Sequence, residues 1–434
     1  MPAPAHHLLR RAATSSGALA LWLYLQHLPL PFLAPDAPNP RLLALGLRPL
    51  VTAFLVVEAL SLLLALAPRF RGPRQRRAGL LTAAWLLGTA LAALQAWQLI
   101  GVLTALSAPL GRPLLLGGAF GPTAAALSLV AGTLLCGALA ELVTRRGLGN
   151  GFALLLSTQV AQELLTLAGL VRDTRDLWGT GAKLVALLAL LAGAALVARL
   201  LRTRPGDGPR IPAPTCSMAV VALPPLLLGL LTGAGERWTA LAPLAEALPQ
   251  RERPALALQA ALAVLLALAL APLFTGRRAV VEAHRRAAAV APPEAIRAAL
   301  LRAHARSLLA VTLAALLPLV MLLLGLPILV SADVALGLAM IAALVADLAG
   351  EVRARRTGAS VAAGAIHRVH AVPPIVAELA AQGIAARPRT MRFRALFHAF
   401  APFAPVQLLV APEHAQAAEA ICARLVQPEP AQLK

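Results

Sequence analysis

The sequence predicts an all-α polytopic membrane protein with ten transmembrane helices and a small cytoplasmic α/β domain near its C-terminal end. Hydrophobic residues make up 59% of the 434 residues, and charged residues only 13%. Apolar runs of about 20 residues recur between short breaks that carry arginine, and each is long enough to cross a hydrocarbon core of about 30 Å. A change of composition after Arg353, Arg355 and Arg356 predicts the added domain.

Ten apolar runs are long enough to span a bilayer. Each is predicted to be helical, because backbone polar groups in lipid must be paired within the segment. Five runs precede the loop near residues 172–183 and five follow it. An odd number per half means that any internal duplication is inverted in the membrane, and such repeats usually enclose a central path. The runs cover residues 14–33, 44–67, 78–104, 122–140, 150–171, 180–201, 216–233, 254–275, 306–327 and 332–352.

The net charge of +20 would suggest a nucleic-acid partner in a soluble chain. Here most basic residues fall in alternate loops, such as Arg145 and Arg146, while the other loops hold most of the acids. The positive-inside rule therefore predicts that both termini are cytoplasmic, and no nucleic acid is expected. The predicted organisation is a cytoplasmic N-terminus (1–13), two five-helix halves (14–171 and 172–352), a linker (353–362), the α/β domain (363–427) and a tail (428–434).

The last 75 residues alternate strand-like and helix-like patterns. AGAIHRVH, IAARPR and VQLLVAP read as strands, and PPIVAELAAQG and EHAQAAEAICARL as helices. This order resembles a small bacterial domain described as a signal-transducing module. The basic run of Arg387, Arg389, Arg392 and Arg394 is open to nucleic acid, lipid headgroups or an acidic partner, and a solvated face is the preferred interpretation.

No enzymatic chemistry is indicated. The sequence has no phosphate-binding glycine loop, no metal cluster and no Ser-His-Asp arrangement at a recognisable spacing. Cys136, Cys216 and Cys422 are scattered, so they are expected to be small buried hydrophobes without a disulfide or metal role. We expect a protein that is not an enzyme and needs no cofactor.

The segment from Glu141 to Leu156, ELVTRRGLGNGFALLL, joins the fourth and fifth runs. Its glycines allow positive φ or close backbone approach. The segment resembles the signature of the SecY family of protein-conducting channels, which reads close to GEQITERGIGNGISLII, although Arg145 stands where an acid is usual. The matching residues are Glu141, Thr144, Arg146, Gly147, Gly149, Asn150 and Gly151.

Weaker collinear matches at 44–63, 210–228, 291–308 and 343–352 extend the resemblance over about residues 10–352. It implies two halves around a pore with a lateral gate, in the bacterial inner membrane, passing or inserting secretory or membrane polypeptides. A SecE-like subunit is the implied partner, and a SecG-like subunit an optional one.

A SecY-like pore is closed by a ring of apolar side chains. By register with the family, the ring residues are Val51, Leu55, Phe152, Leu156, Leu223 and Met340. Ordinary helix packing is the alternative for these residues. Glu58 takes the position of a polar residue beside the lateral gate in the family register. The alternative is a carboxylate that snorkels or is hydrogen-bonded between helices. Two other functions remain open: a proton-coupled secondary transporter that uses Glu58 or Glu163, and a SecY-derived scaffold that does not conduct.

Three features depart from the family pattern. Only about ten residues, 34–43, join the first two spans, so the plug helix is expected to be missing or vestigial. The loop 199–210 is short, and Ala291 stands where the family carries an arginine. Engagement of SecA or ribosomes is therefore expected to be weakened. The residues expected in the cytoplasmic docking loops are Arg210, Arg285, Arg286, Pro292, Glu294 and Arg306.

Overall fold

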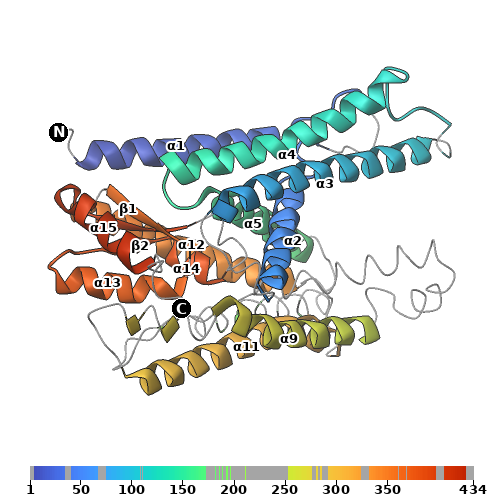
Figure 1. The fold of residues 1–434 in the computed structure, drawn as a ribbon. Helices are drawn as coiled ribbons and strands as arrows, with labels where there is room; N and C mark the ends of the chain where they lie inside the picture. Colours follow the sequence, from blue (N-terminus) through green and yellow to red (C-terminus); the bar gives the residue numbers. More distant parts are fainter. Residues whose placement is uncertain are drawn as a thin grey trace. The chain divides into compact units, whose positions relative to one another are not determined.

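A computed structural model gives the fold (Figure 1). It describes residues 4–34, 41–66, 75–107, 109, 111–172, 253–275, 292–323, 332–359, 361–367, 369–396 and 405–426, with isolated positions between 181 and 285. The chain divides into two compact units, Met1–Leu156 and Ser157–Lys434.

Most of the described residues are helical. The helices are α1 (Pro4–Leu25), α2 (Arg48–Leu66), α3 (Gln75–Ser107), α4 (Phe120–Arg146), α5 (Gly151–Arg172), α9 (Arg253–Thr275), α11 (Pro293–Leu323) and α12 (Ala332–Arg356), followed by α13 (Val372–Ala381), α14 (Met391–Leu396) and α15 (Ala415–Val426). The strands are β1 (Val361–Ile366), β2 (Arg387–Arg389) and β3 (Val406–Val410), and two 3₁₀ turns are η2 (Val369–Ala371) and η4 (Pro412–His414).

Three described helices are long and apolar enough to cross a membrane: Gly79–Ser107, Phe120–Arg146 and Pro293–Leu317. The predicted runs 44–67, 78–104, 122–140, 150–171, 254–275 and 332–352 lie on α2, α3, α4, α5, α9 and α12. The sixth and seventh predicted spans lie largely outside the described residues. The helical membrane class is therefore confirmed, and the count of ten spans stays a prediction.

Three predicted helix bounds are wrong. The first helix begins at Pro4, ahead of the apolar run that starts at residue 14. It ends at Leu25 and not at residue 33, because Pro29 and Pro31 follow and proline cannot donate the backbone hydrogen bonds of a helix. The helix predicted to begin at residue 306 begins at Pro293. Proline suits the first turn of a helix, and Glu294 in that turn complements the helix dipole.

In the first unit, α1 and α3 both pack against α4, and α2 packs against α3 (Figure 1). Small residues permit the close approach. A Cβ built on Gly88 would lie 2.6 Å from Leu50 Cδ2, and one on Gly137 would lie 2.8 Å from Leu50 Cδ1. Leu50 is fully buried. One leucine of α2 thus occupies the space that glycines of α3 and α4 leave, as is common where membrane helices pack.

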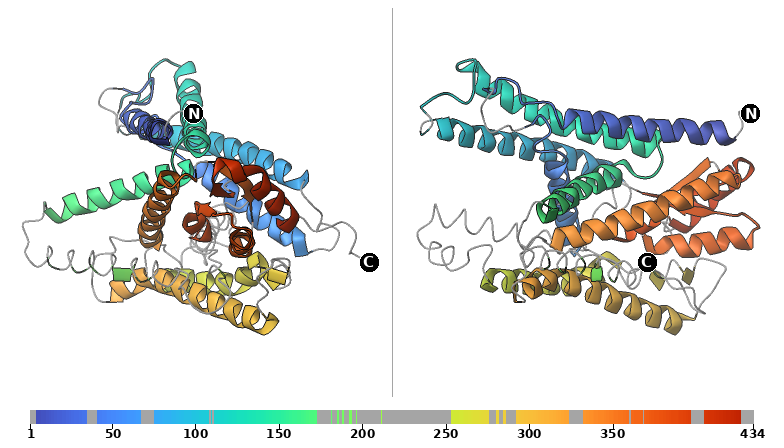
Figure 2. Two further views of the ribbon diagram at one scale, coloured as in Figure 1. Left: turned by 90° about the vertical axis from the view of Figure 1, so that its left-hand side faces the viewer. Right: turned by 180° about the vertical axis from the view of Figure 1, so that it is seen from behind.

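In the second unit, α9 lies beside α11, and α11 also contacts α12 (Figure 2). Three antiparallel strands follow in the order β1-β3-β2. The strands and helices predicted for the C-terminal residues are present, with a further short helix, α14.

Alternate residues of β3 face opposite sides of the sheet. Val406, Leu408 and Val410 belong to a buried cluster with residues of α13 and α15, so these two helices cover one face. The other face carries Gln407 and the paired Arg389 of β2, and α12 contacts β2 and β3 there. The helix predicted as the tenth span therefore also provides a layer of the C-terminal α/β fold.

Candidate functional site

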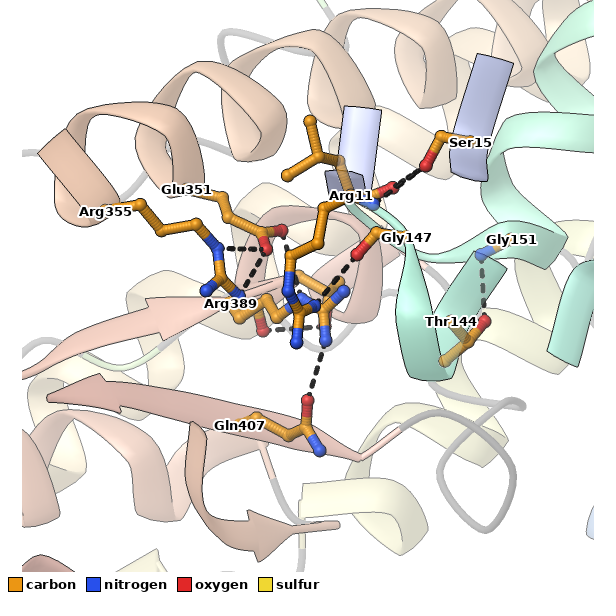
Figure 3. Close-up of polar contacts among 11 residues, drawn as sticks. Arg11, Ser15, Thr144, Gly147, Gly151, Glu351, Arg355, Arg389 and Gln407 are labelled. Carbon is orange, nitrogen blue, oxygen red and sulfur yellow. Dashed lines mark hydrogen bonds and ion pairs between the residues drawn. The ribbon is translucent and has the colours of Figure 1, made fainter. Parts of the chain in front are cut away.

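The turn between α4 and α5 is held by the first helix of the chain. Arg11 Nη1 donates a hydrogen bond of 3.0 Å to the carbonyl oxygen of Gly147. Ser15 Oγ accepts one of 2.8 Å from the Leu148 N–H and donates one of 3.4 Å to the Leu148 carbonyl. Figure 3 shows both side chains reaching the turn from α1. A polar backbone segment is thus satisfied by residues more than 130 positions away in the sequence.

Each glycine of the turn has its own steric reason. A Cβ on Gly147 would lie 2.4 Å from Ser15 Oγ, and one on Gly151 would lie 1.9 Å from the Ala140 carbonyl oxygen. Gly149 adopts φ +72°, in the left-handed region. The first and last glycines therefore allow close packing, and the middle one allows the backbone to reverse.

The start of α5 is fixed by two side chains of the signature. Asn150, which is buried, accepts a hydrogen bond of 3.1 Å at Oδ1 from the Ala153 N–H, the geometry of a helix N-cap. Thr144 Oγ1 accepts one of 2.9 Å from the Gly151 N–H. Because Thr144 lies in the last turns of α4, it joins the end of one helix to the start of the next.

The charged residues of the signature remain at the surface. Arg145 and Arg146 are exposed. Arg145 Nε pairs with Glu141 Oε1 at 2.6 Å, one helical turn earlier. Because both side chains are solvent-accessible, this pair contributes little to stability. The residues that shape the turn are therefore the glycines, Thr144 and Asn150.

The predicted ring residues of the first unit are all buried. Val51 and Leu55 of α2 are 9% and 7% exposed, and Phe152 and Leu156 of α5 are 2% and 8% exposed. The Phe152 ring packs edge to face on Phe54, with centroids 5.6 Å apart. Of the other two, Met340 of α12 is 1% exposed, and Leu223 lies outside the described residues. The five described residues are therefore buried.

The two carboxylates of the transporter hypothesis lie on described helices. Glu58 is in α2 and Glu163 in α5. Their side chains lie outside the described part of the structure. Both roles proposed for Glu58 thus stay predictions.

The predicted docking residues are only partly described. Arg285, Pro292 and Glu294 are exposed, and Arg306 Nε donates to the Arg302 carbonyl one turn back on α11. Beside them, Ile211, Val280 and Ile296 share a buried apolar cluster with the first turns of α11. Arg210, Arg286 and Ala291 lie outside the described residues.

Sequence patterns did not identify the α1 residues that hold the turn. Arg11 precedes an ordinary apolar run and Ser15 lies at its start, and nothing in their local sequence indicates a partner near residue 147. The interpretation of the basic run as a solvated face holds for Arg387 and Arg392, which are exposed. It is wrong for Arg389 and Arg394, which are buried at 4% and 0% exposed. Arg389 pairs with Glu351 of α12, a carboxylate that could have indicated the contact.

These features define a multi-pass helical membrane protein in which a glycine-rich turn and small residues set the helix packing. Residues 41–204 match the model of the SecY family. Members of this family are channels and not enzymes, in agreement with the sequence-based prediction. No curated protein matches the chain.

Solved structures are similar to this chain at low identity, and the two with a TM-score above 0.5 share its fold. A SecY protein, solved in work on how its plug domain stabilises the closed channel, is 13% identical with a TM-score of 0.52. A structure described as a protein-conducting channel is 12% identical, also with a TM-score of 0.52. Sec61 in a canine ribosome–channel complex is 13% identical with a TM-score of 0.49. Each match covers 80% of this chain and 93% of the other.

Proposed function

We propose that this chain is the channel subunit of a protein translocase, passing polypeptides across the bacterial inner membrane or inserting them into it. The observation that carries the proposal is the SecY family domain over residues 41–204, on a fold similar to most of the length of a protein-conducting channel. Both termini are cytoplasmic in this proposal, since the arginine-rich loops then face inward. The energy that moves the polypeptide comes, in this proposal, from a source outside this chain.

The mechanism requires a waist that excludes ions when the channel is idle. Apolar side chains at a narrow point do this by dewetting, because water and ions find no polar partners there. The proposed ring is Val51, Leu55, Phe152, Leu156, Leu223 and Met340. The five described members are buried, as a closed ring requires and as ordinary helix packing also gives. Opening would part the two halves, and Glu58 would line the lateral gate.

The plug is proposed to be missing or vestigial. The described residues 26–34 and 41–47, between α1 and α2, form turns and isolated bridges rather than a helix. Phe32 and Ala34 exchange backbone hydrogen bonds with the loop before α4, Leu116 N–H to Phe32 O at 2.7 Å and Ala34 N–H to Leu114 O at 2.9 Å. This anchoring supports a resting seal that depends on the ring.

The proposed partners are a SecE-like subunit that clamps the two halves and an optional SecG-like subunit. Engagement of SecA or ribosomes is proposed to be weak, because loop 199–210 is short and Ala291 replaces an arginine of the family pattern. The exposed Arg285, Pro292 and Glu294 are the described residues at which such contacts would form.

Photocrosslinking to a stalled secretory chain tests the function. A benzophenone amino acid replaces Phe152 in one variant and Leu127 in another, because Leu127 of α4 is 63% exposed and should face lipid. We expect the nascent chain to crosslink at residue 152 and not at residue 127. Equal, background-level crosslinking at both positions would contradict the channel and favour a scaffold that does not conduct.

A further inference from the structure

One face of α12 connects the predicted ring to the C-terminal α/β unit. Met340, Leu344, Asp347 and Glu351 follow one another at intervals of four, three and four residues, so they lie along one side of the helix. All four are buried. The first belongs to the predicted ring, and the last two contact the segment of β2 and α14.

Asp347 holds the first turn of α14. Its Oδ2 accepts hydrogen bonds from the backbone N–H groups of Arg392 at 3.0 Å and Phe393 at 2.9 Å, and its Oδ1 accepts from Arg392 at 3.2 Å. A carboxylate at the start of a helix satisfies donors that the helix itself leaves open. The acceptor here comes from another helix, 45 residues earlier in the chain.

Glu351 holds β2 through an ion pair with a side chain. Its Oε2 accepts from Arg389 Nε at 3.0 Å, and its Oε1 from Arg355 Nε at 2.9 Å. Arg389 Nη1 then donates to Gln407 Oε1 of β3 at 2.9 Å, and Figure 3 shows this chain of contacts. Glu351, Arg355 and Arg389 are 3%, 3% and 4% exposed. Breaking a buried ion pair of this kind has a high free-energy cost, because each charge would be left buried without its partner.

The residue between the two attachments has an unfavourable backbone conformation. Thr390 lies between β2 and α14 with φ +61°, in the left-handed region that a β-branched residue rarely adopts. Its side chain is buried, and its Oγ1 donates to the Arg389 carbonyl. Such strain persists only where the surroundings impose it. Release of Asp347 and Glu351 would therefore let this connection relax.

We propose that residues 387–396 are a latch: Asp347 and Glu351 bind the α/β unit to α12, and opening of the latch frees the part of α12 that carries Met340. The α/β unit thus controls the mobility of the last membrane helix. The consequence for the pore rests on the proposed function, whereas the coupling between latch and helix does not. By reciprocity, a change at Met340 would also alter the stability of the latch.

The full chain in lipid nanodiscs provides the test, with no translocating polypeptide. A Met340→Cys background reports thiol labelling at residue 340, located by mass spectrometry, and hydrogen exchange of the same samples reports residues 389–396. Asp347→Ala removes the cap. Arg353→Ala is the control, because Arg353 is exposed on the same helix. We expect Asp347→Ala to raise both the labelling rate and the exchange rate by about tenfold or more, and Arg353→Ala to change neither.

Two results would overturn the proposal. Faster exchange at 389–396 with unchanged labelling at residue 340 would mean that the α/β unit is attached but not coupled. No change in either measurement would mean that Asp347 holds nothing. If Asp347→Ala does not fold, Asp347→Asn carries the same test with a smaller effect, since asparagine keeps one acceptor oxygen. Failure of the photocrosslinking experiment would refute the channel while leaving these outcomes unaffected.

Discussion

Thr144 Oγ1, in α4, accepts a hydrogen bond of 2.9 Å from the backbone N–H of Gly151, the first residue of α5. The same hydroxyl donates to the Ala140 carbonyl at 2.8 Å. These two hydrogen bonds hold the start of α5 so close to the end of α4 that no side chain fits at residue 151. The conformation of the turn is thus set by steric exclusion as well as by hydrogen bonding.

Replacement of Gly151 by alanine should be strongly destabilising. The new Cβ would lie 1.9 Å from the Ala140 carbonyl oxygen, so α5 must shift away from α4, at a free-energy cost of about 1–3 kcal/mol or more. Thermal unfolding in detergent measures the effect. Gly101→Ala in α3 is the matched control, since a Cβ there meets nothing within 4 Å, and it should be neutral or slightly stabilising. Equal melting temperatures for the two variants would contradict the packing described for the turn.

Ser15→Ala should loosen the turn from a distance. Loss of the hydroxyl leaves the Leu148 N–H without the acceptor it has in the structure. Because this pair is half-buried, the free-energy cost should be about 0.5–1.5 kcal/mol. Hydrogen exchange over residues 147–151 should accelerate accordingly. Thr14→Ala is the control, because Thr14 bonds only within α1, to the Arg10 carbonyl, at an exposed position. Identical exchange in both variants would show that Ser15 does not hold the turn.

Gly364→Ala should destabilise the α/β unit for two separable reasons. Gly364 has φ +69°, and a Cβ would lie 2.8 Å from Cys422 Sγ and 2.9 Å from Cys422 Cβ. The left-handed conformation costs an alanine about 1–2 kcal/mol, and the steric conflict adds about 1–3 kcal/mol. Gly383→Ala measures the cost of the left-handed conformation alone, since Gly383 has φ +74° with open space around it. Urea unfolding of the unit should rank Gly364→Ala as the less stable variant, and the reverse order would contradict the contact with Cys422.

The Cys422 thiol should be unreactive in the folded protein. Burial, with a smaller contribution from the charge of Glu419, raises the pKa of Cys422 to about 11. Only the thiolate reacts, so alkylation near pH 8 should be about 100-fold slower than in the unfolded chain. The unfolded thiol loses its proton at lower pH than the folded one, so this group should reduce stability as pH rises from about 9 to 11. Mass spectrometry after iodoacetamide treatment measures the rate, and equal rates with and without urea would exclude a protected thiol.

Local patterns were sufficient for most helices and for the turn signature. Apolar runs between arginines predicted α2 to α5, α9 and α12, because helix is the only open choice for such a run in lipid. The end of the first helix was missed although Pro29 and Pro31 mark it, since the apolar composition continues past them. The early start of α11 was missed because its first turns are amphipathic and arginine-rich, and only their packing with Ile211 and Val280 makes them part of a core.

Contacts between distant segments could not be predicted in the same way. Asp347 lies near the end of the predicted tenth span, and the arginines from 387 to 394 form a basic run. Their relationship depends on α12 lying against the sheet, which composition does not encode. The pairing of Ser15 with Leu148 likewise requires that α1 packs on α4.

Glu58→Gln separates the proposed channel from the alternative of a proton-coupled carrier. Glu58 lies in α2, directly after the buried Val57, and an ionisable group within an apolar run is costly unless it faces a cavity or a partner. A gate lining needs polarity but no proton, so glutamine should keep reporter translocation into inverted vesicles within about twofold of the unmodified protein. A carrier that titrates at this residue should lose transport, because glutamine binds no proton. Glu163→Gln extends the comparison to the other candidate carboxylate. Loss of transport in either variant, together with loss of the pH dependence of transport, would favour the carrier.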